Sequence, residues 1–91
     1  LTLRHAETGE VTTLPVSGVF VALGRVPDTA LLAELAELDP SGFAASDESC
    51  RTKTPGLFIA GDCRSKTIRQ LTTAVADGTV AAMAACEFLN A

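Results

Sequence analysis

The order of hydrophobic and polar residues predicts two kinds of β-strand. Residues 1–6 and 11–14 mix apolar and polar positions, and Glu7-Thr8-Gly9-Glu10 between them offers a glycine for a turn position with positive φ. This pattern predicts a β-hairpin. The segments Gly18–Gly24 and Leu57–Ala60 are continuously apolar, which is typical of strands buried on both faces.

Two helices are expected from the spacing of apolar residues. The first covers roughly Ala30–Glu37 and would be capped by Asp28 or Thr29. The second covers Gln70–Leu89, which contains no proline. One face of this helix carries mostly small residues and should lie very close to a neighbouring sheet; its members are Leu71, Val75, Gly78, Ala82, Ala85 and Leu89. Thr54-Pro55-Gly56 between the helices suits a type II turn.

Composition narrows the class of protein. The 91 residues allow one small domain, and the net charge of −4 argues against a nucleic-acid binder or an anionic-membrane binder. Three cysteines at positions 50, 63 and 86 form no Cys-x-x-Cys pair and favour free thiols in a reducing cytoplasm. The longest apolar runs are too short to span a bilayer. The chain begins with alternating apolar and polar residues and no Met, so we expect a piece of a longer protein.

The stretch "GDCRSKTIRQ", residues 61–70, carries the candidate chemistry. Gly61 lets the backbone approach a ligand closely, and Asp62 can accept hydrogen bonds from ribityl or ribose hydroxyls. The start of the following helix stabilises negative charge on a ligand such as a reduced flavin. A structural interpretation stands beside the functional one: Gly-Asp is a common turn, and the loop cations Arg64, Lys66 and Arg69 are more often solvated than bound to a ligand. Local physics alone favours the structural interpretation.

The ordered combination of motifs resembles a known family. "TPGLFIAGDC" followed by "RQLTTAVADGTVAA" is similar to the C-terminal part of pyridine-nucleotide–disulfide oxidoreductases. Arg69-Gln70, Thr73-Ala74 and Asp77-Gly78 narrow this resemblance to the low-molecular-weight thioredoxin reductase type. "GVFVALGRVPDT", residues 18–29, resembles the segment where that family's NADPH domain ends and its FAD domain resumes. The resemblance extends from about Val11 to Leu89.

The resemblance implies an α/β fold: a partial FAD/NAD(P)-binding, Rossmann-like domain of three layers, with an N-terminal hairpin and a long C-terminal helix. Residues 1–24 would end the NADPH-binding domain, and residues 25–91 would belong to the FAD-binding domain. The cofactors would be FAD and, for the whole enzyme, NADPH; the partners would be thioredoxin and a second subunit. The implied cofactor-binding residues are Gly61, Asp62, Cys63, Arg69, Gln70 and Leu71.

Important family motifs are missing from these 91 residues. Neither the GxGxxG fingerprint for FAD, nor the NADPH fingerprint, nor the redox-active Cys-x-x-Cys is present, so we expect no activity from this chain alone and assign no catalytic residue. Two alternatives stay open. One is a related flavoprotein, such as a ferredoxin-dependent reductase, a dithiol oxidase or a ferredoxin–NADP reductase. The other is a non-enzymatic α/β interaction module whose glycines serve only turns.

Overall fold

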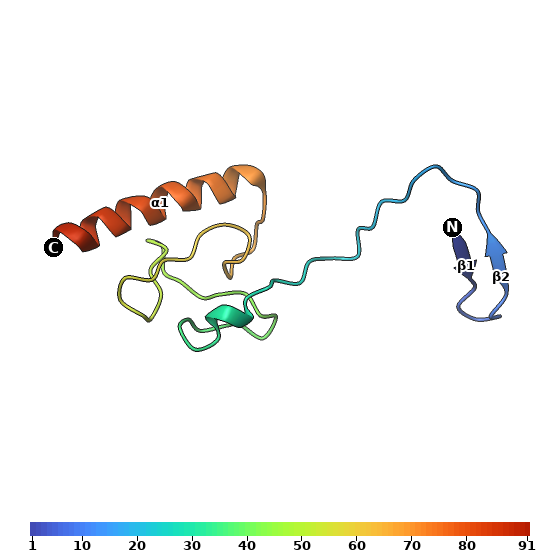
Figure 1. Cartoon of the computed structure of the whole chain (residues 1–91), viewed down its shortest axis with the longest axis horizontal. Helices are drawn as coiled ribbons and strands as arrows, with labels where there is room; N and C mark the ends of the chain where they lie inside the picture. Colours follow the sequence, from blue (N-terminus) through green and yellow to red (C-terminus); the bar gives the residue numbers. More distant parts are fainter.

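The computed structural model describes all residues, 1–91, and consists of a body, an extended segment and a separate hairpin (Figure 1). The elements along the chain are strand β1 (Thr2–Arg4), strand β2 (Val11–Thr13), the short 3-10 helix η1 (Ala30–Leu32) and helix α1 (Leu71–Asn90). The molecule is elongated, with extents of 64 × 26 × 20 Å. The hairpin lies at one end, and α1 runs along the body at the other.

The hairpin prediction is confirmed. β1 and β2 are antiparallel, with Thr2 opposite Thr13 and Arg4 opposite Val11. Gly9 has a φ of +72°, which supplies the left-handed turn position expected from the sequence. All six strand residues are exposed, and the two strands contact no other helix or strand.

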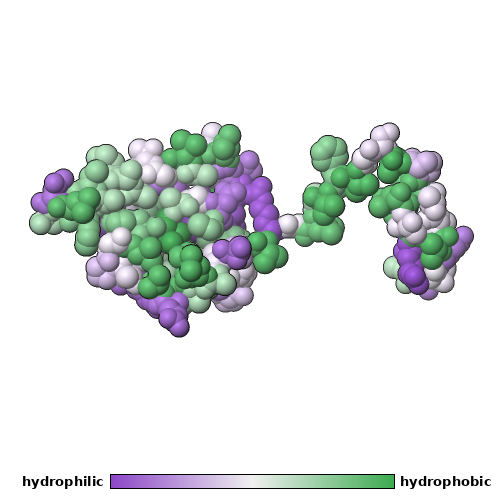
Figure 2. All heavy atoms as spheres, in the orientation of Figure 1, coloured by the Kyte–Doolittle hydropathy of each residue, from purple (hydrophilic) through white to green (hydrophobic).

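The two predicted buried strands are wrong as secondary structure. Gly18–Gly24 forms no strand, and its side chains, including Phe20 and Leu23, are exposed. Figure 2 shows this segment as a thin row of largely hydrophobic residues between the hairpin and the body. No other strand of the chain lies beside it, so its backbone has no ladder partner. Leu57–Ala60 forms only one isolated bridge, between Phe58 and Arg51, although Ile59 is buried.

The predicted helix over residues 30–37 is also wrong, because only the single turn of η1 forms. A helix of eight residues is marginal without tertiary support. Here Thr29 makes no capping bond to the helix and donates its hydroxyl to the Gly42 carbonyl instead. The Leu35 carbonyl accepts a bond of 2.6 Å from Thr54 Oγ1, so long-range contacts replace the continuing helix. The type II turn at Thr54 is confirmed by Gly56, whose φ is +83°, and by the bond from Leu57 N to Thr54 O.

The core of the body is small and made of small side chains. Ala36, Ala44 and Ile59 form its centre, with Leu32, Leu38 and Cys63 packed around them.

Helix α1 matches the predicted range within one residue at each end, but the face that it turns towards the body is not the predicted one. Its inward face carries Thr73, Ala74, Asp77, Ala81 and Ala84, whereas most of the predicted inward face is exposed. Within these residues, no second layer covers that outer face of α1.

Candidate functional site

The loop that carries the predicted site begins with a glycine that the backbone requires. Gly61 has a φ of +86°, in the left-handed region that disfavours other residues. A Cβ added at Gly61 would meet Ala74 Cβ at 3.9 Å, an ordinary van der Waals contact. The loop therefore packs directly on the first turn of α1, with its conformation set by backbone geometry rather than by lack of space.

Asp62 and Cys63 line a shallow hollow of about 330 Å³. The Asp62 side chain is 46% exposed, and its Oδ2 lies 2.6 Å from Nη1 of Arg25, which is 63% exposed. The volume is at the lower end of the range for small-ligand sites, about 300–1,000 Å³. The remaining lining residues are Val26, Pro27 and Phe43. The hollow thus combines one carboxylate, one guanidinium and apolar walls, which suits part of a ligand bearing both hydroxyl and anionic groups.

Arg69 is neither free nor simply solvated. Its guanidinium stacks 3.5 Å from the centre of the Phe43 ring, a cation–π contact. Its Nε donates to the Asp62 carbonyl at 3.0 Å, and its Nη2 donates to the Arg64 carbonyl at 3.1 Å. Arg69 therefore holds the backbone of the loop and forms a bridge to the wall of the hollow.

Helix α1 begins just beyond the loop. Gln70 is its N-cap in extended conformation, and its N–H donates to Thr73 Oγ1 at 3.0 Å. Leu71 is 82% exposed. The N–H groups of a first helical turn have no partner within the helix, so this end can face a ligand with backbone donors. Gln70 and Leu71 do not line the hollow, whereas Gly61–Cys63 and Arg69 lie at or beside it.

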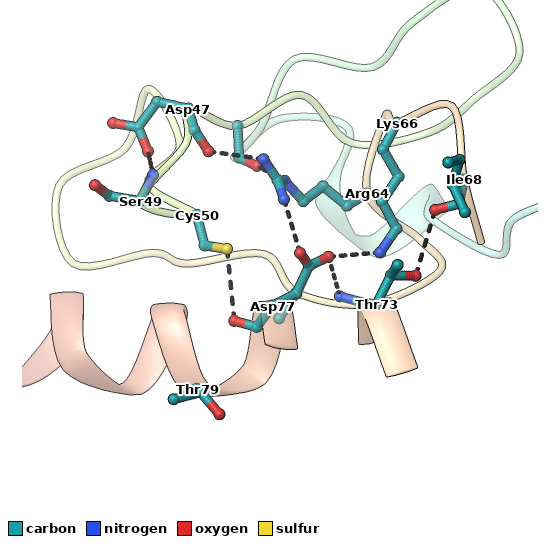
Figure 3. Close-up of polar contacts among 12 residues, drawn as sticks. Asp47, Ser49, Cys50, Arg64, Lys66, Ile68, Thr73, Asp77 and Thr79 are labelled. Carbon is teal, nitrogen blue, oxygen red and sulfur yellow. Dashed lines mark hydrogen bonds and ion pairs between the residues drawn. The ribbon is translucent and has the colours of Figure 1, made fainter. Parts of the chain in front are cut away.

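One acidic residue joins most of the loop together and was not foreseen as a site residue (Figure 3). Asp77 lies on the inward face of α1, where its Oδ1 is 2.9 Å from Arg64 Nη1 and its Oδ2 is 2.7 Å from Lys66 Nζ. The Gly61 N–H also donates to Oδ2, at 3.1 Å. All three charged side chains are only 13–14% exposed. The sequence signal was present: a carboxylate inside an otherwise almost uncharged helix, after a loop rich in cations.

A second carboxylate holds the opposite side of the loop. Asp39 Oδ2 accepts a bond of 2.7 Å from Ser65 Oγ, and its Oδ1 accepts the N–H groups of Ser41 and Phe43. The bond from Ser65, followed by these backbone bonds, lowers the pKa of Asp39 against a partial desolvation. For Asp77, desolvation raises the pKa, but the bonds and charges of Lys66 and Arg64 outweigh it, so its pKa is also lowered.

The three cysteines are all free. Cys63 donates to the Ala60 carbonyl at 3.4 Å, and Cys50 donates to the Asp77 carbonyl at 3.6 Å. Burial raises the pKa of the Cys50 thiol, which disfavours a reactive thiolate there.

No group of three His, Cys, Asp or Glu residues is arranged to bind a metal ion. No helix of the structure combines the length and the apolar character that crossing a membrane requires.

Comparison with known proteins decides the family. The profile described as pyridine nucleotide-disulphide oxidoreductase matches residues 2–78 of the chain. The chain belongs to this family. Its sequence is 43% identical over 90 residues to the "34.2 kDa protein in rubredoxin operon" of Clostridium pasteurianum, covering 99% of the chain. It is 45% identical over 92 residues to the thioredoxin reductase of Streptomyces coelicolor, covering the whole chain.

Solved structures agree with this membership of the pyridine nucleotide-disulphide oxidoreductases. The crystal structure of thioredoxin reductase from Streptococcus pyogenes matches 98% of the chain with a TM-score of 0.79 and 37% identity. This likeness confirms the predicted fold class, of which the hairpin and the long helix are the elements formed here. The chain spans only about 29% of each of these three proteins, which agrees with the expectation of a piece of a longer protein.

Proposed function

We propose that this chain is part of an FAD-dependent thioredoxin reductase and supplies one wall of its flavin site. The observation that carries the proposal is identity of about 40% to thioredoxin reductases along almost the whole chain. The whole enzyme would take electrons from NADPH and pass them to a disulfide and then to thioredoxin. When bound, the flavin supplies the redox chemistry; the residues present here bind and orient it.

The residues at the hollow fit such a cofactor. Asp62 offers an exposed carboxylate that can accept hydrogen bonds from hydroxyl groups, and Arg25 beside it offsets the negative charge of a phosphorylated ligand. Gly61 contributes close backbone approach but no free donor, because its N–H is bonded to Asp77. Cys63 would be a wall residue without a chemical role, and Arg69, Gln70 and Leu71 would present the start of α1 to the isoalloxazine ring.

The proposal also covers the domain division, location and assembly of the enzyme. Residues 1–24 would belong to the NADPH-binding domain, and residues 25–91 to the FAD-binding domain. Three free thiols support a reducing cytoplasm as the location. The uncovered apolar residues along residues 18–26 and on α1 support burial against other parts of a homodimeric enzyme.

A chimera tests the proposal directly. In it, this chain replaces the matching segment of the Streptomyces coelicolor thioredoxin reductase. We expect the purified chimera to hold about one flavin per chain and to reduce thioredoxin with NADPH. The same chimera with Asp62→Ala should bind flavin more weakly than the unsubstituted chimera. The reason is that a hydrogen bond from a hydroxyl to a charged carboxylate contributes about 1.5–3 kcal/mol. A folded but colourless chimera would contradict the proposal.

A second candidate is a related flavoprotein that uses a different electron donor or acceptor. It is favoured by the 43% identity to the Clostridium pasteurianum protein, whose name does not describe it as a thioredoxin reductase. The two candidates share the flavin wall and differ in the segments that these 91 residues lack. Assaying the complete parent polypeptide with NADPH, NADH and reduced ferredoxin separates them.

A further inference from the structure

One side chain, Asp77, contacts the first half of the loop that precedes α1 at three points, in addition to the bonds that Asp39 and Arg69 make to this loop. Both oxygens of Asp77 are used: Oδ1 by Arg64, and Oδ2 by Lys66 and by the Gly61 N–H. These three partners span residues 61–66, the whole first half of the loop. Figure 3 shows Arg64 and Lys66 converging on Asp77 from the loop that passes over α1. One carboxylate on a rigid helix therefore fixes the beginning and the end of this half.

The same contacts remove two cations from contact with a ligand. The fork of Arg64 is fully engaged, because its Nε also donates to Ser46 Oγ at 2.7 Å and its Nη2 to the Asp47 carbonyl at 3.0 Å. Lys66 is 13% exposed and points to Asp77. Asp62, which lies between the fixed residues, is the one charged side chain of this half-loop that is directed outward. The cation that lines the hollow is Arg25, and Arg69 is stacked on the Phe43 ring of its wall.

We propose that Asp77 is the positioning residue of the flavin site: it holds the 61–66 loop so that Asp62 faces the ligand while Arg64 and Lys66 stay internal. The identity of the ligand rests on the proposed function, whereas the mechanical part, that Asp77 holds the 61–66 loop, does not. Without the Asp77 carboxylate, the Gly61 N–H loses its acceptor, and two nearly buried cations lose their counter-charge. The loop would then open towards solvent, and the direction of Asp62 would no longer be fixed.

Trypsin tests the mechanical part on the 91-residue chain itself, because Arg64 and Lys66 are trypsin sites. In Asp77→Asn, we expect cleavage after these two residues to rise about tenfold relative to cleavage after exposed Lys53 in the same molecule. Glu48→Gln is the matched control: it removes one exposed negative charge without a recorded partner and should leave the ratio unchanged. Asp77→Glu keeps the charge and should restore most of the protection. An unchanged ratio in Asp77→Asn would overturn the proposal.

The chimeric reductase tests the positioning part. Asp77→Asn should weaken flavin binding about tenfold and shift the visible absorption bands of bound flavin, and Asp77→Glu should recover both. If the unsubstituted chimera takes up no flavin, the proposed function fails, while the trypsin ratio still decides whether Asp77 holds the loop. If the chimera binds flavin equally well and with the same spectrum with or without Asp77→Asn, the positioning role is refuted and the proposed function stands.

Discussion

Two glycine-to-alanine substitutions on either side of the start of α1 should have opposite effects on stability. Gly78 lies inside α1, and an added Cβ there would find no atom within 4 Å. Because alanine restricts the unfolded chain and favours helix, Gly78→Ala should raise the free energy of unfolding by about 1 kcal/mol. That value corresponds to about a fivefold increase in the folding equilibrium constant.

Gly61→Ala adds the same methyl group with the opposite expected result. The Cβ itself would fit, since its closest neighbour, Ala74 Cβ, would be 3.9 Å away. The backbone at φ +86° does not suit alanine, and the left-handed conformation costs a non-glycine residue about 1–2 kcal/mol. The predicted difference between the two variants is therefore about 2–3 kcal/mol, arising almost entirely from backbone conformation.

Urea unfolding followed by circular dichroism at 222 nm measures both variants against the unsubstituted chain. The helix signal reports α1, which contributes most of the helical residues. A lower midpoint for Gly78→Ala would refute the exposure of this face of α1, because it would mean that another surface packs against Gly78. A Gly61→Ala variant as stable as the original would refute the left-handed conformation of the loop.

Three further results are expected. First, because the pKa values of Asp39 and Asp77 are lowered on folding, their contribution to stability is complete above pH about 4 and is lost as pH falls through the lowered values, so urea midpoints should drop in acid. Secondly, Phe88→Ala should lower the free energy of unfolding by about 1–2 kcal/mol, because the half-exposed Phe88 ring contacts Phe58 edge-on, with 6.3 Å between the ring centroids. Phe20→Ala, at an exposed ring, should change the urea midpoint little. Thirdly, Glu87→Gln should cost less than about 0.5 kcal/mol because its ion pair is exposed, and adding 0.5 M salt, as an order of magnitude, should abolish the difference.

The elements that the sequence predicts correctly are those that local chemistry decides. The hairpin follows from apolar and polar residues that alternate on either side of Gly9, and the turn at residues 54–56 follows from the Pro-Gly pair. Helix α1 follows from a run of twenty residues without proline. Each requires only contacts between near neighbours in the chain. The placement of Asp62 beside a hollow also follows from a local feature, the glycine that turns the loop before it.

The contacts that escaped prediction join residues far apart in sequence. Asp77 meets Arg64 across 13 positions, and Arg25 meets Asp62 across 37. The sequence shows which residues can form ion pairs but not which partners the fold brings together. The sequence therefore favours solvated loop cations, although Arg64 and Lys66 are the least exposed cations of the four ion pairs, at 14% and 13%.

The errors about burial have a different cause. Gly18–Gly24 and the small-residue face of α1 have the composition of buried surfaces, yet only six residues of the chain are buried. Burying a large apolar side chain contributes about 1.5–3 kcal/mol, so leaving Phe20, Leu23 and Leu71 exposed forgoes several kcal/mol of stabilisation. The surfaces that would cover them are not among these 91 residues, whereas the proteins that the chain matches are more than three times as long. The apolar pattern therefore specifies contacts that this chain cannot make with itself, which agrees with the chain spanning only about 29% of the proteins it matches.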